Sequence, residues 1–138
     1  MLGAEPIQPE GWPRPSGYAD GMSASGGVGG RVVAVAGQVG WNPVTHQFET
    51  DDFVRQVRQA LLNVKAVLEA AGCTILDVVR VTWYLTDRAA YVANQKRVGE
   101  VWREVFGKHY PAMTLVIVAG LLEAKAKVEI EVTAVATE

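Results

Sequence analysis

Residues 53–71 carry apolar side chains at intervals of three and four positions, and this spacing constrains the fold more than any other feature of the chain. An α-helix places residues at these intervals on one side, so the segment predicts a helix with one apolar face. That face consists of Phe53, Val57, Ala60, Leu61, Val64, Val67, Leu68 and Ala71. Thr50, Asp51 or Asp52 can cap the helix at its N-terminus, and Gly72 is well placed to end it. The apolar face must be buried against another element, which requires a packed domain.

The segments that follow predict three strands and a second helix. Residues 78–85 and 127–135 alternate between apolar and polar side chains, and 113–119 are almost wholly apolar, as in a strand covered on both faces. Asp87 can cap a helix that ends at Gly107. In the first of these strands, one face should carry Val79, Val81, Trp83 and Leu85, and the other Val78, Arg80, Thr82 and Tyr84. The second helix should bury Tyr91, Val98, Val101, Trp102, Val105 and Phe106.

The N-terminal part of the chain predicts an extended arm and a hairpin. Residues 1–16 are rich in Pro and Glu and should have little structure of their own. A glycine cluster at 26–30 separates two short apolar runs, 22–25 and 32–36, which is the pattern of a β-hairpin. A phosphate-binding loop is disfavoured because no Lys-Ser/Thr pair follows the glycines and no helix is predicted there.

The predicted order is therefore β-β-α-β-α-β-β, in one domain over residues 17–138. A chain of 138 residues that is 49% apolar can build one core and is short for two. The simplest architecture is an α+β fold with a single sheet and two helices on one face. The other face would leave Tyr84, Val116, Val118 and Val135 in water, and an apolar patch of this size predicts self-association.

Charge and composition exclude several classes of function. The net charge of -2 gives no basic surface for nucleic acid, and no apolar run is long enough to span a bilayer. The first residues lack the basic and apolar regions of a signal peptide, and a single cysteine, Cys73, allows no internal disulfide, so a cytoplasmic protein is expected. His46 and His109 have no partners at ligand spacing, so no metal site is expected. Cys73 follows a helix C-terminus, which disfavours a catalytic thiolate.

Several short motifs occur in a fixed order from residue 16 to the last strand. They are Ser16-Gly17-Tyr18, Ala36-Gly37-Gln38, Asn63-Val64-Lys65, Glu69-Ala70-Ala71-Gly72, Tyr84-Leu85-Thr86-Asp87, Asn94, Tyr110-Pro111-Ala112 and Val128-Glu129-Ile130-Glu131. Their order and spacing together resemble the RidA/YjgF family of enamine and imine deaminases, also labelled L-PSP endoribonuclease-like. The resemblance implies a chorismate-mutase-like fold, a homotrimer, and ligand sites in the clefts between subunits.

The resemblance also implies a reaction, in which water attacks a small 2-imino or 2-amino-unsaturated acid and releases ammonia and a keto acid. In such proteins an arginine within Pro-Ala-Arg binds the substrate carboxylate through two charge-assisted hydrogen bonds. This chain has Pro111-Ala112-Met113 instead, and Leu115 stands where the family often has cysteine. Methionine donates no hydrogen bond, so no such clamp can form at this position. We therefore expect a larger or less acidic substrate, of which an aminomuconate-like intermediate is one example.

Glu129 is the expected catalytic residue, because the resemblance places it beside the attacking water. A carboxylate in a partly desolvated cleft can orient water or carry a proton. Alternatively, Glu129 pairs with a basic residue of a neighbouring subunit, and for Glu131 that structural role is favoured. The expected substrate-binding residues are Tyr18, Gln38, Trp41, Asn94 and Met113. For each of these, packing, loop shaping or solvation is the alternative role, and Arg80 or Arg97 could replace the lost charge.

Two functions follow from these residues. The first is hydrolytic deamination of a reactive imine or enamine without a cofactor or metal. The second is a non-catalytic ligand-binding or regulatory trimer of the same fold, which the missing arginine favours. A ribonuclease is disfavoured because the chain lacks a basic stripe. The expected partners are further copies of the chain and a small molecule, without nucleic acid or membrane.

Overall fold

Six strands form one mixed sheet in the computed structural model, which describes residues 4–16, 18–25 and 30–137. Across the sheet the order is β1 (Glu5–Ile7), β2 (Gly21–Ser25), β3 (Arg31–Val39), β6 (Val128–Ala136), β4 (Val78–Leu85) and β5 (Ala112–Ile117). Strands β4 and β5 are parallel, and the other neighbouring pairs are antiparallel. The expected α+β arrangement is confirmed, and β1 adds an edge strand within residues 1–16, where composition predicts only an arm.

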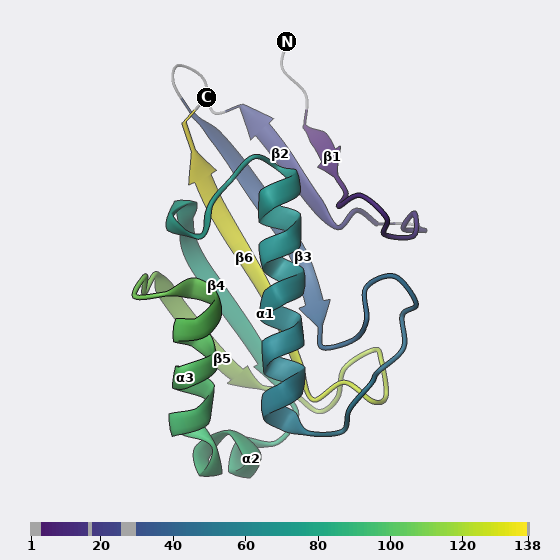
Figure 1. The fold of residues 1–138 in the computed structure, drawn as a ribbon, viewed down its shortest axis with the longest axis vertical. Coiled ribbons are helices and arrows are strands. Elements are labelled where there is room, and N and C mark those ends of the chain that lie inside the picture. Colours follow the sequence, from purple (N-terminus) through teal and green to yellow (C-terminus); the bar gives the residue numbers. More distant parts are fainter. Residues whose placement is uncertain (1–3, 17, 26–29, 138) are drawn as a thin grey trace.

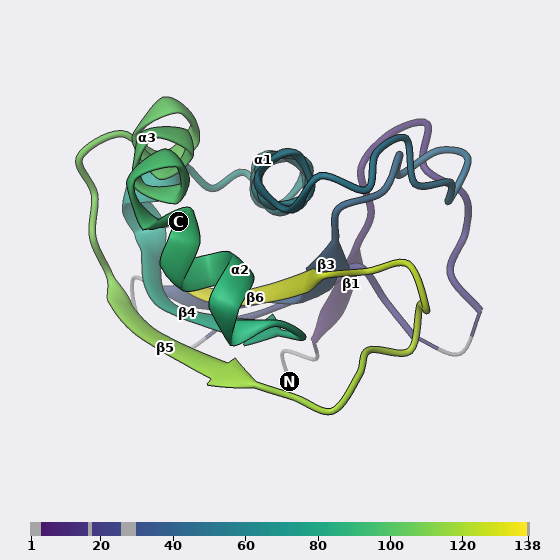
Figure 2. The same ribbon diagram turned by 90° about the horizontal axis from the view of Figure 1, so that it is seen from below.

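Two long helices cover one face of this sheet (Figure 1). Helix α1 (Phe53–Ala70) begins at Asp52, whose carboxylate accepts a hydrogen bond from the backbone N–H of Arg55 at 2.9 Å. It ends before Gly72, which has the positive φ of 75° that glycine adopts readily. Figure 2 shows α1 and α3 (Gln95–Phe106) side by side above the same face, and every residue predicted for the apolar face of α1 is buried.

The segment after β4 forms two helices where the sequence predicts one. Helix α2 (Arg88–Ala93) ends at Asn94, and α3 starts at the next residue. The Asn94 side chain donates a hydrogen bond to the carbonyl of Ala90 at 2.7 Å, inside α2. The predicted apolar stripe is confirmed, because its members are buried in the core or packed against it. A short 3-10 helix, Ile75–Asp77, connects α1 to β4. No helix within the described residues has the length and apolar character needed to cross a membrane.

Two predictions about the strands were wrong in detail. Val79 was expected to share a face with Val81, Trp83 and Leu85, which are buried, yet Val79 is 48% exposed and Val78 is buried. The pairing of β4 with β6 shifts by one residue between Val78 and Arg80, and such a shift reverses the side-chain alternation. Strand β5 was expected to be covered on both faces, but it is the outer strand of the sheet, and all its residues are exposed in the single chain.

The face opposite the helices carries exposed apolar side chains, among them Val116 and Val135 of the four predicted, whereas Tyr84 is half-buried and donates a hydrogen bond to Glu131. Strands β2 and β3 form the expected antiparallel hairpin, although Gly26, Gly27 and Gly29 lie outside the described residues. Val32 and Val135 are directly opposite each other on β3 and β6, and both side chains are exposed. The exposed large apolar residues of this face are Met22, Val32, Val116 and Val135. The single chain therefore leaves these apolar side chains uncovered, among polar residues of the same face such as Thr82 and Glu131.

Candidate functional site

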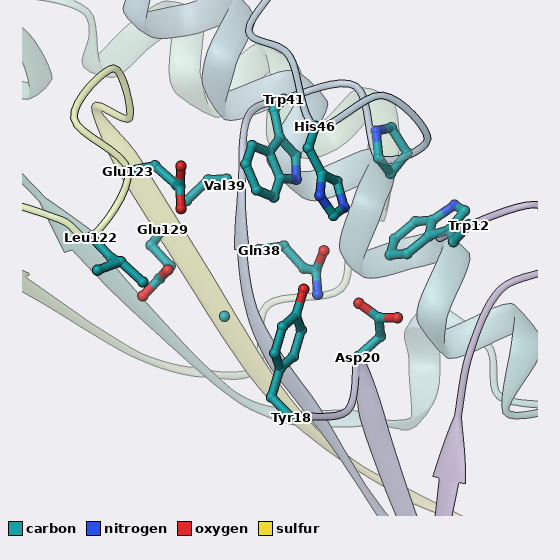
Figure 3. A pocket seen from close by; sticks show the side chains of 12 residues that line it. Trp12, Tyr18, Asp20, Gln38, Val39, Trp41, His46, Leu122, Glu123 and Glu129 are labelled. Carbon is teal, nitrogen blue, oxygen red and sulfur yellow. The ribbon is translucent and has the colours of Figure 1, made fainter. Parts of the chain in front are cut away.

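A pocket of about 230 Å³ opens where the ends of β3 and β6 meet the loops that flank them (Figure 3). It contains four of the six residues expected from sequence, namely Tyr18, Gln38, Trp41 and Glu129. The other residues that line it are Trp12, Asp20, Gly37, Val39, Pro43, His46, Leu122 and Glu123. These residues come from the segment before β2, from β3 and its following loop, and from the segment around the start of β6.

Glu129 lies near the start of β6 with its side chain over the backbone of Gly37. A Cβ built on Gly37 would come 2.8 Å from Cδ of Glu129 and 3.0 Å from its Oε2. The pairing of β3 with β6 shifts between Val35 and Gln38, and Gly37 lies within this irregular stretch. Burial raises the pKa of the half-buried Glu129 carboxyl, and repulsion from Glu131 raises it further. Such a group exchanges protons closer to neutral pH than an ordinary glutamate does.

Asp20, which sequence reasoning missed, lines the same pocket from the segment just before β2. Its side chain is 7% exposed, and its Oδ2 is buried without a hydrogen-bond partner among the described residues. Figure 3 shows the carboxyl group directed into the same space as the Tyr18 hydroxyl and the Gln38 amide. Burial raises the pKa of Asp20, while the nearby His46 opposes this rise. The sequence places this polar residue between Tyr18 and a predicted strand, which was the one signal that could have drawn attention to it. No spacing pattern indicated that Asp20 is buried.

The aromatic side of the pocket is fixed by hydrogen bonds in the loop after β3. The rings of Trp41 and His46 stack with centroids 4.2 Å apart and planes 5° apart. Asn63, buried on α1, donates from Nδ2 to the carbonyl oxygens of Val39 and Trp41 at 3.1 and 3.0 Å. These bonds tie the Trp41 backbone to the core, so the indole is positioned by the fold.

A second buried amide holds the segment that carries Leu122 and Glu123. Gln56, fully buried on α1, donates from Nε2 to the carbonyls of Thr50 and Lys125, both at 3.1 Å. Its Oε1 accepts a hydrogen bond from the backbone N–H of Lys127 at 2.8 Å. Both amide atoms are therefore used to join two loops around the pocket to the helix behind it.

The pocket is rich in acidic groups. Its lining contains three carboxylates, from Asp20, Glu123 and Glu129, and one histidine, His46. No lysine or arginine is among the described residues that line it. Burial raises the pKa of the Tyr18 hydroxyl, and the negative charges of Asp20 and Glu123 add to this. The pocket therefore has a negative potential of its own.

The model of the family described as Endoribonuclease L-PSP matches residues 18–136, which include all elements from β2 to β6. The chain belongs to this family, the RidA/YjgF family. A RutC family protein of Pyrococcus horikoshii is 37% identical over 118 residues, which are 85% of this chain and 86% of that protein. The 2-iminobutanoate/2-iminopropanoate deaminase of Capra hircus is 34% identical over 105 residues, which are 76% of this chain and 73% of that protein.

Solved structures of RidA/YjgF proteins have the same fold. The crystal structure of E. coli TdcF with bound serine superposes with a TM-score of 0.75 at 30% identity, over 95% of this chain and 98% of that chain. The E. coli YjgF gene product gives a TM-score of 0.75 at 32% identity, with the same coverage of both chains. The likeness therefore extends over nearly the full length of each protein.

Asn94 and Met113, also predicted from the RidA/YjgF resemblance, do not line this pocket. Asn94 lies between α2 and α3, where its Oδ1 accepts a hydrogen bond from Arg97 at 3.3 Å. Met113 lies on β5 opposite Val81 and lines a second pocket beside α3, together with Trp83, Tyr91, Gln95, Val98, Gly99, Trp102 and Tyr110. Within a single chain, the predicted site residues therefore fall into separate places.

The other basic residues and potential metal ligands considered in the sequence analysis lie outside this pocket, with the exception of His46. Arg80 is exposed on β4, and Arg97 lies 3.8 Å from the carboxylate of Asp52. His109 contacts the carbonyl of Val78 through Nε2 at 2.8 Å. Cys73 is buried, and burial raises the pKa of its thiol. Across residues 4–16, 18–25 and 30–137, no group of three His, Cys, Asp or Glu side chains could hold a metal ion.

Proposed function

We propose that this RidA/YjgF protein hydrolyses a small reactive imine or enamine to a carbonyl compound and ammonia. The observation that carries the proposal is the placement of Glu129, a half-buried carboxylate with a raised pKa, in one pocket with Tyr18 and Gln38. A carboxylate in this setting can take a proton from water and return it to a leaving group. A relative at 34% identity that is named an imine deaminase supports the same reaction class.

In the proposed reaction, Glu129 orients a water molecule toward the imine carbon. The water oxygen bonds to that carbon while the C=N π electrons move to nitrogen, and Glu129 accepts the proton that the water releases. Glu129 then gives this proton to the nitrogen of the tetrahedral intermediate. The hydroxyl group of the intermediate then gives up its proton, which Glu129 passes to the same nitrogen. The C–N bond breaks, ammonia leaves, and the carbon–oxygen double bond forms. The Tyr18 hydroxyl and the Gln38 amide are positioned to orient the substrate.

The site is proposed to be completed by a second copy of the chain in a homotrimer. The exposed apolar sheet face would be covered by such packing, and Asn94 and Met113, which lie outside their own chain's pocket, would approach the pocket of a neighbour. Met113 would then supply an apolar wall in place of a carboxylate clamp. The substrate is accordingly one that needs no arginine at this position.

The test is the release of ammonia and carbonyl product from imines generated in situ by an amino-acid oxidase or an amine oxidase. The natural protein should accelerate release, and Glu129→Gln should lower the rate about 100-fold while the melting temperature stays close to that of the natural protein. Met113→Arg is assayed in parallel. An absence of acceleration with every imine, in a correctly folded protein, would refute the proposal.

A non-catalytic ligand-binding or regulatory trimer is the second candidate, and Met113 favours it because methionine cannot bind a substrate carboxylate. Ligand binding without turnover, together with turnover by Met113→Arg alone, would support this function. Turnover by the natural protein that disappears in Glu129→Gln would exclude it.

A further inference from the structure

Aromatic and acidic side chains surround the pocket together, and this combination suits a cation. The aromatic groups are Trp12, Tyr18 and Trp41, and the acidic groups are Asp20, Glu123 and Glu129. We propose that the pocket takes the protonated nitrogen of an imine or amine that carries no carboxylate. The substrates would then be iminium ions derived from amines and not imino acids. The assignment of substrates rests on the proposed hydrolysis, whereas the binding of cations does not.

The strongest support is the unsatisfied carboxylate of Asp20. The side chain is 7% exposed, its Oδ2 has no partner among the described residues, and the group is directed into the pocket (Figure 3). Its backbone carbonyl accepts a hydrogen bond from the N–H of Ala36 at 2.8 Å, which fixes the residue beside β3. A buried acceptor without a partner costs free energy, and an iminium or ammonium N–H would satisfy it.

The aromatic rings supply the second part of a cation site. Trp41 is fixed by the hydrogen bond from Asn63 to its carbonyl oxygen and by the stacking of its ring on His46, so one indole face is already occupied. Figure 3 shows Trp41, Tyr18 and Trp12 around the space that Gln38 and Asp20 also border. A cation near the faces of such rings is attracted by their quadrupoles, and the organic part of the ligand is covered at the same time.

An anionic substrate is disfavoured by the same lining. A carboxylate in this pocket would face three acidic side chains, and His46 is the one basic group among the described residues around it. The residues outside the described ranges, which are 1–3, 17, 26–29 and 138, include no lysine or arginine. Met113 cannot supply the missing positive charge if a neighbouring copy places it here. Like charges repel more strongly when they are partly desolvated.

The reaction of this substrate class balances without a further reactant. An iminium ion and one water molecule give one carbonyl compound and one ammonium ion. The C=N bond is replaced by a C=O bond, both protons of water end on nitrogen, and the total charge of +1 is unchanged. No electron is gained or lost, so no oxidant or reductant is required. The ammonium product is itself a cation, and it leaves through the open side of the pocket.

Binding is tested by calorimetry on the full-length protein with three probes that share a phenylethyl group: 2-phenylethylamine, 2-phenylethanol and 3-phenylpropionate. The amine should bind at least about tenfold more tightly than the carboxylate. Asp20→Asn and Glu123→Gln should each weaken amine binding about three- to tenfold and leave the alcohol unchanged. Glu100→Gln, which removes an exposed charge from α3, is the matched control and should have no effect. Equal or tighter binding of the carboxylate would overturn the proposal.

Turnover separates this inference from the proposed function. Imines with the same carbon skeleton are generated from 2-phenylethylamine by an amine oxidase and from phenylalanine by an amino-acid oxidase. Preferential acceleration of the amine-derived imine supports both ideas. Preference for the phenylalanine-derived imine leaves the hydrolase proposal intact and overturns the substrate class. Tight binding of the amine without acceleration of either reaction refutes the hydrolase and leaves the cation site standing.

Discussion

The carboxylate of Glu129 packs directly on the backbone of Gly37. A Cβ at position 37 would lie 2.8 Å from Cδ of Glu129 and 2.9 Å from its Cγ. Carbon atoms do not approach this closely in ordinary packing, so any side chain at position 37 would displace the glutamate. Glu129, the proposed proton carrier, can therefore occupy its observed position only because residue 37 is glycine.

Replacing Gly37 with alanine should impair catalysis without unfolding the protein. The new methyl group would push the flexible Glu129 side chain aside, and displacement of a reacting group by about 1 Å can lower a rate about 100-fold. The measurement is the rate of ammonia release, together with the melting temperature. Gly120→Ala is the matched control, because a Cβ at Gly120 meets nothing within 4 Å. An unchanged rate in Gly37→Ala would show that the position of Glu129 is not needed.

The pH dependence of kcat/KM should have an acidic limb set by Glu129. Burial and the negative charge of Glu131 raise its pKa, and a general base acts only when ionised, so the rate should fall as pH drops through this raised pKa. Glu131→Gln removes the repulsion, lowers the pKa of Glu129 and moves the limb to lower pH. Asp20, Glu123 and His46 share the pocket and are unchanged in this variant. A limb that stays in place or moves to higher pH would contradict the assignment.

The spacing of apolar residues correctly predicted the helices and strands whose side chains recur at regular intervals. The extent of α1 follows from its apolar spacing and Gly72, and the structure selects Asp52 from the three predicted caps. The alternation of β6 identifies which of its residues are buried. The irregular pairing at Val78–Arg80 could not be predicted, because a shift by one residue leaves no mark in composition. The apolar sequence of β5 predicted cover on both faces, whereas every residue of β5 is exposed in the single chain. Periodicity does not indicate whether another element of the same chain lies over an apolar strand.

The candidate site was predictable only through the family resemblance. Tyr18, Gln38, Trp41 and Glu129 come from distant segments, and no spacing rule brings them into one pocket. Asp20 escaped notice because it is buried beside β3, to which its backbone is hydrogen-bonded, and a local pattern does not reveal that contact. The buried amides Gln56 and Asn63 fall on the apolar face of α1, where sequence alone does not indicate which loops they join.

Disruption of the apolar sheet face should dissociate the proposed homotrimer. Val135 lies opposite Val32 on this face, and an aspartate there would place an unpaired charge in the subunit contact, which should weaken association about 100-fold or more. The molecular mass of Val135→Asp is measured by sedimentation. Leu76→Asp, at a residue 70% exposed in the segment before β4, is the control for an added charge. An unchanged mass for Val135→Asp would show that this face does not form the contact.

Replacement of Asp20 by asparagine should stabilise the protein. A buried carboxyl with a raised pKa binds more protons when folded than when unfolded, so the unfolding free energy of the natural protein falls as pH rises from the ordinary range of an aspartate through the raised pKa. Asparagine does not titrate, so this decline should disappear in Asp20→Asn. Above the raised pKa, the variant should be more stable by about 1 kcal/mol, which corresponds to a melting temperature about 4 °C higher.

At lower pH, where the natural Asp20 is protonated, the two proteins should converge in stability. Thermal unfolding across this pH range, with Glu100→Gln as the control for loss of one acidic group, measures the difference. A variant that is less stable at neutral pH would mean that the Asp20 carboxylate already has a stabilising partner and is not free for a ligand. Asp20→Asn could instead be more stable than the natural protein and bind 2-phenylethylamine more weakly. That result would mean that the unpaired carboxylate of Asp20 lowers the stability of the fold and is needed to bind a cation.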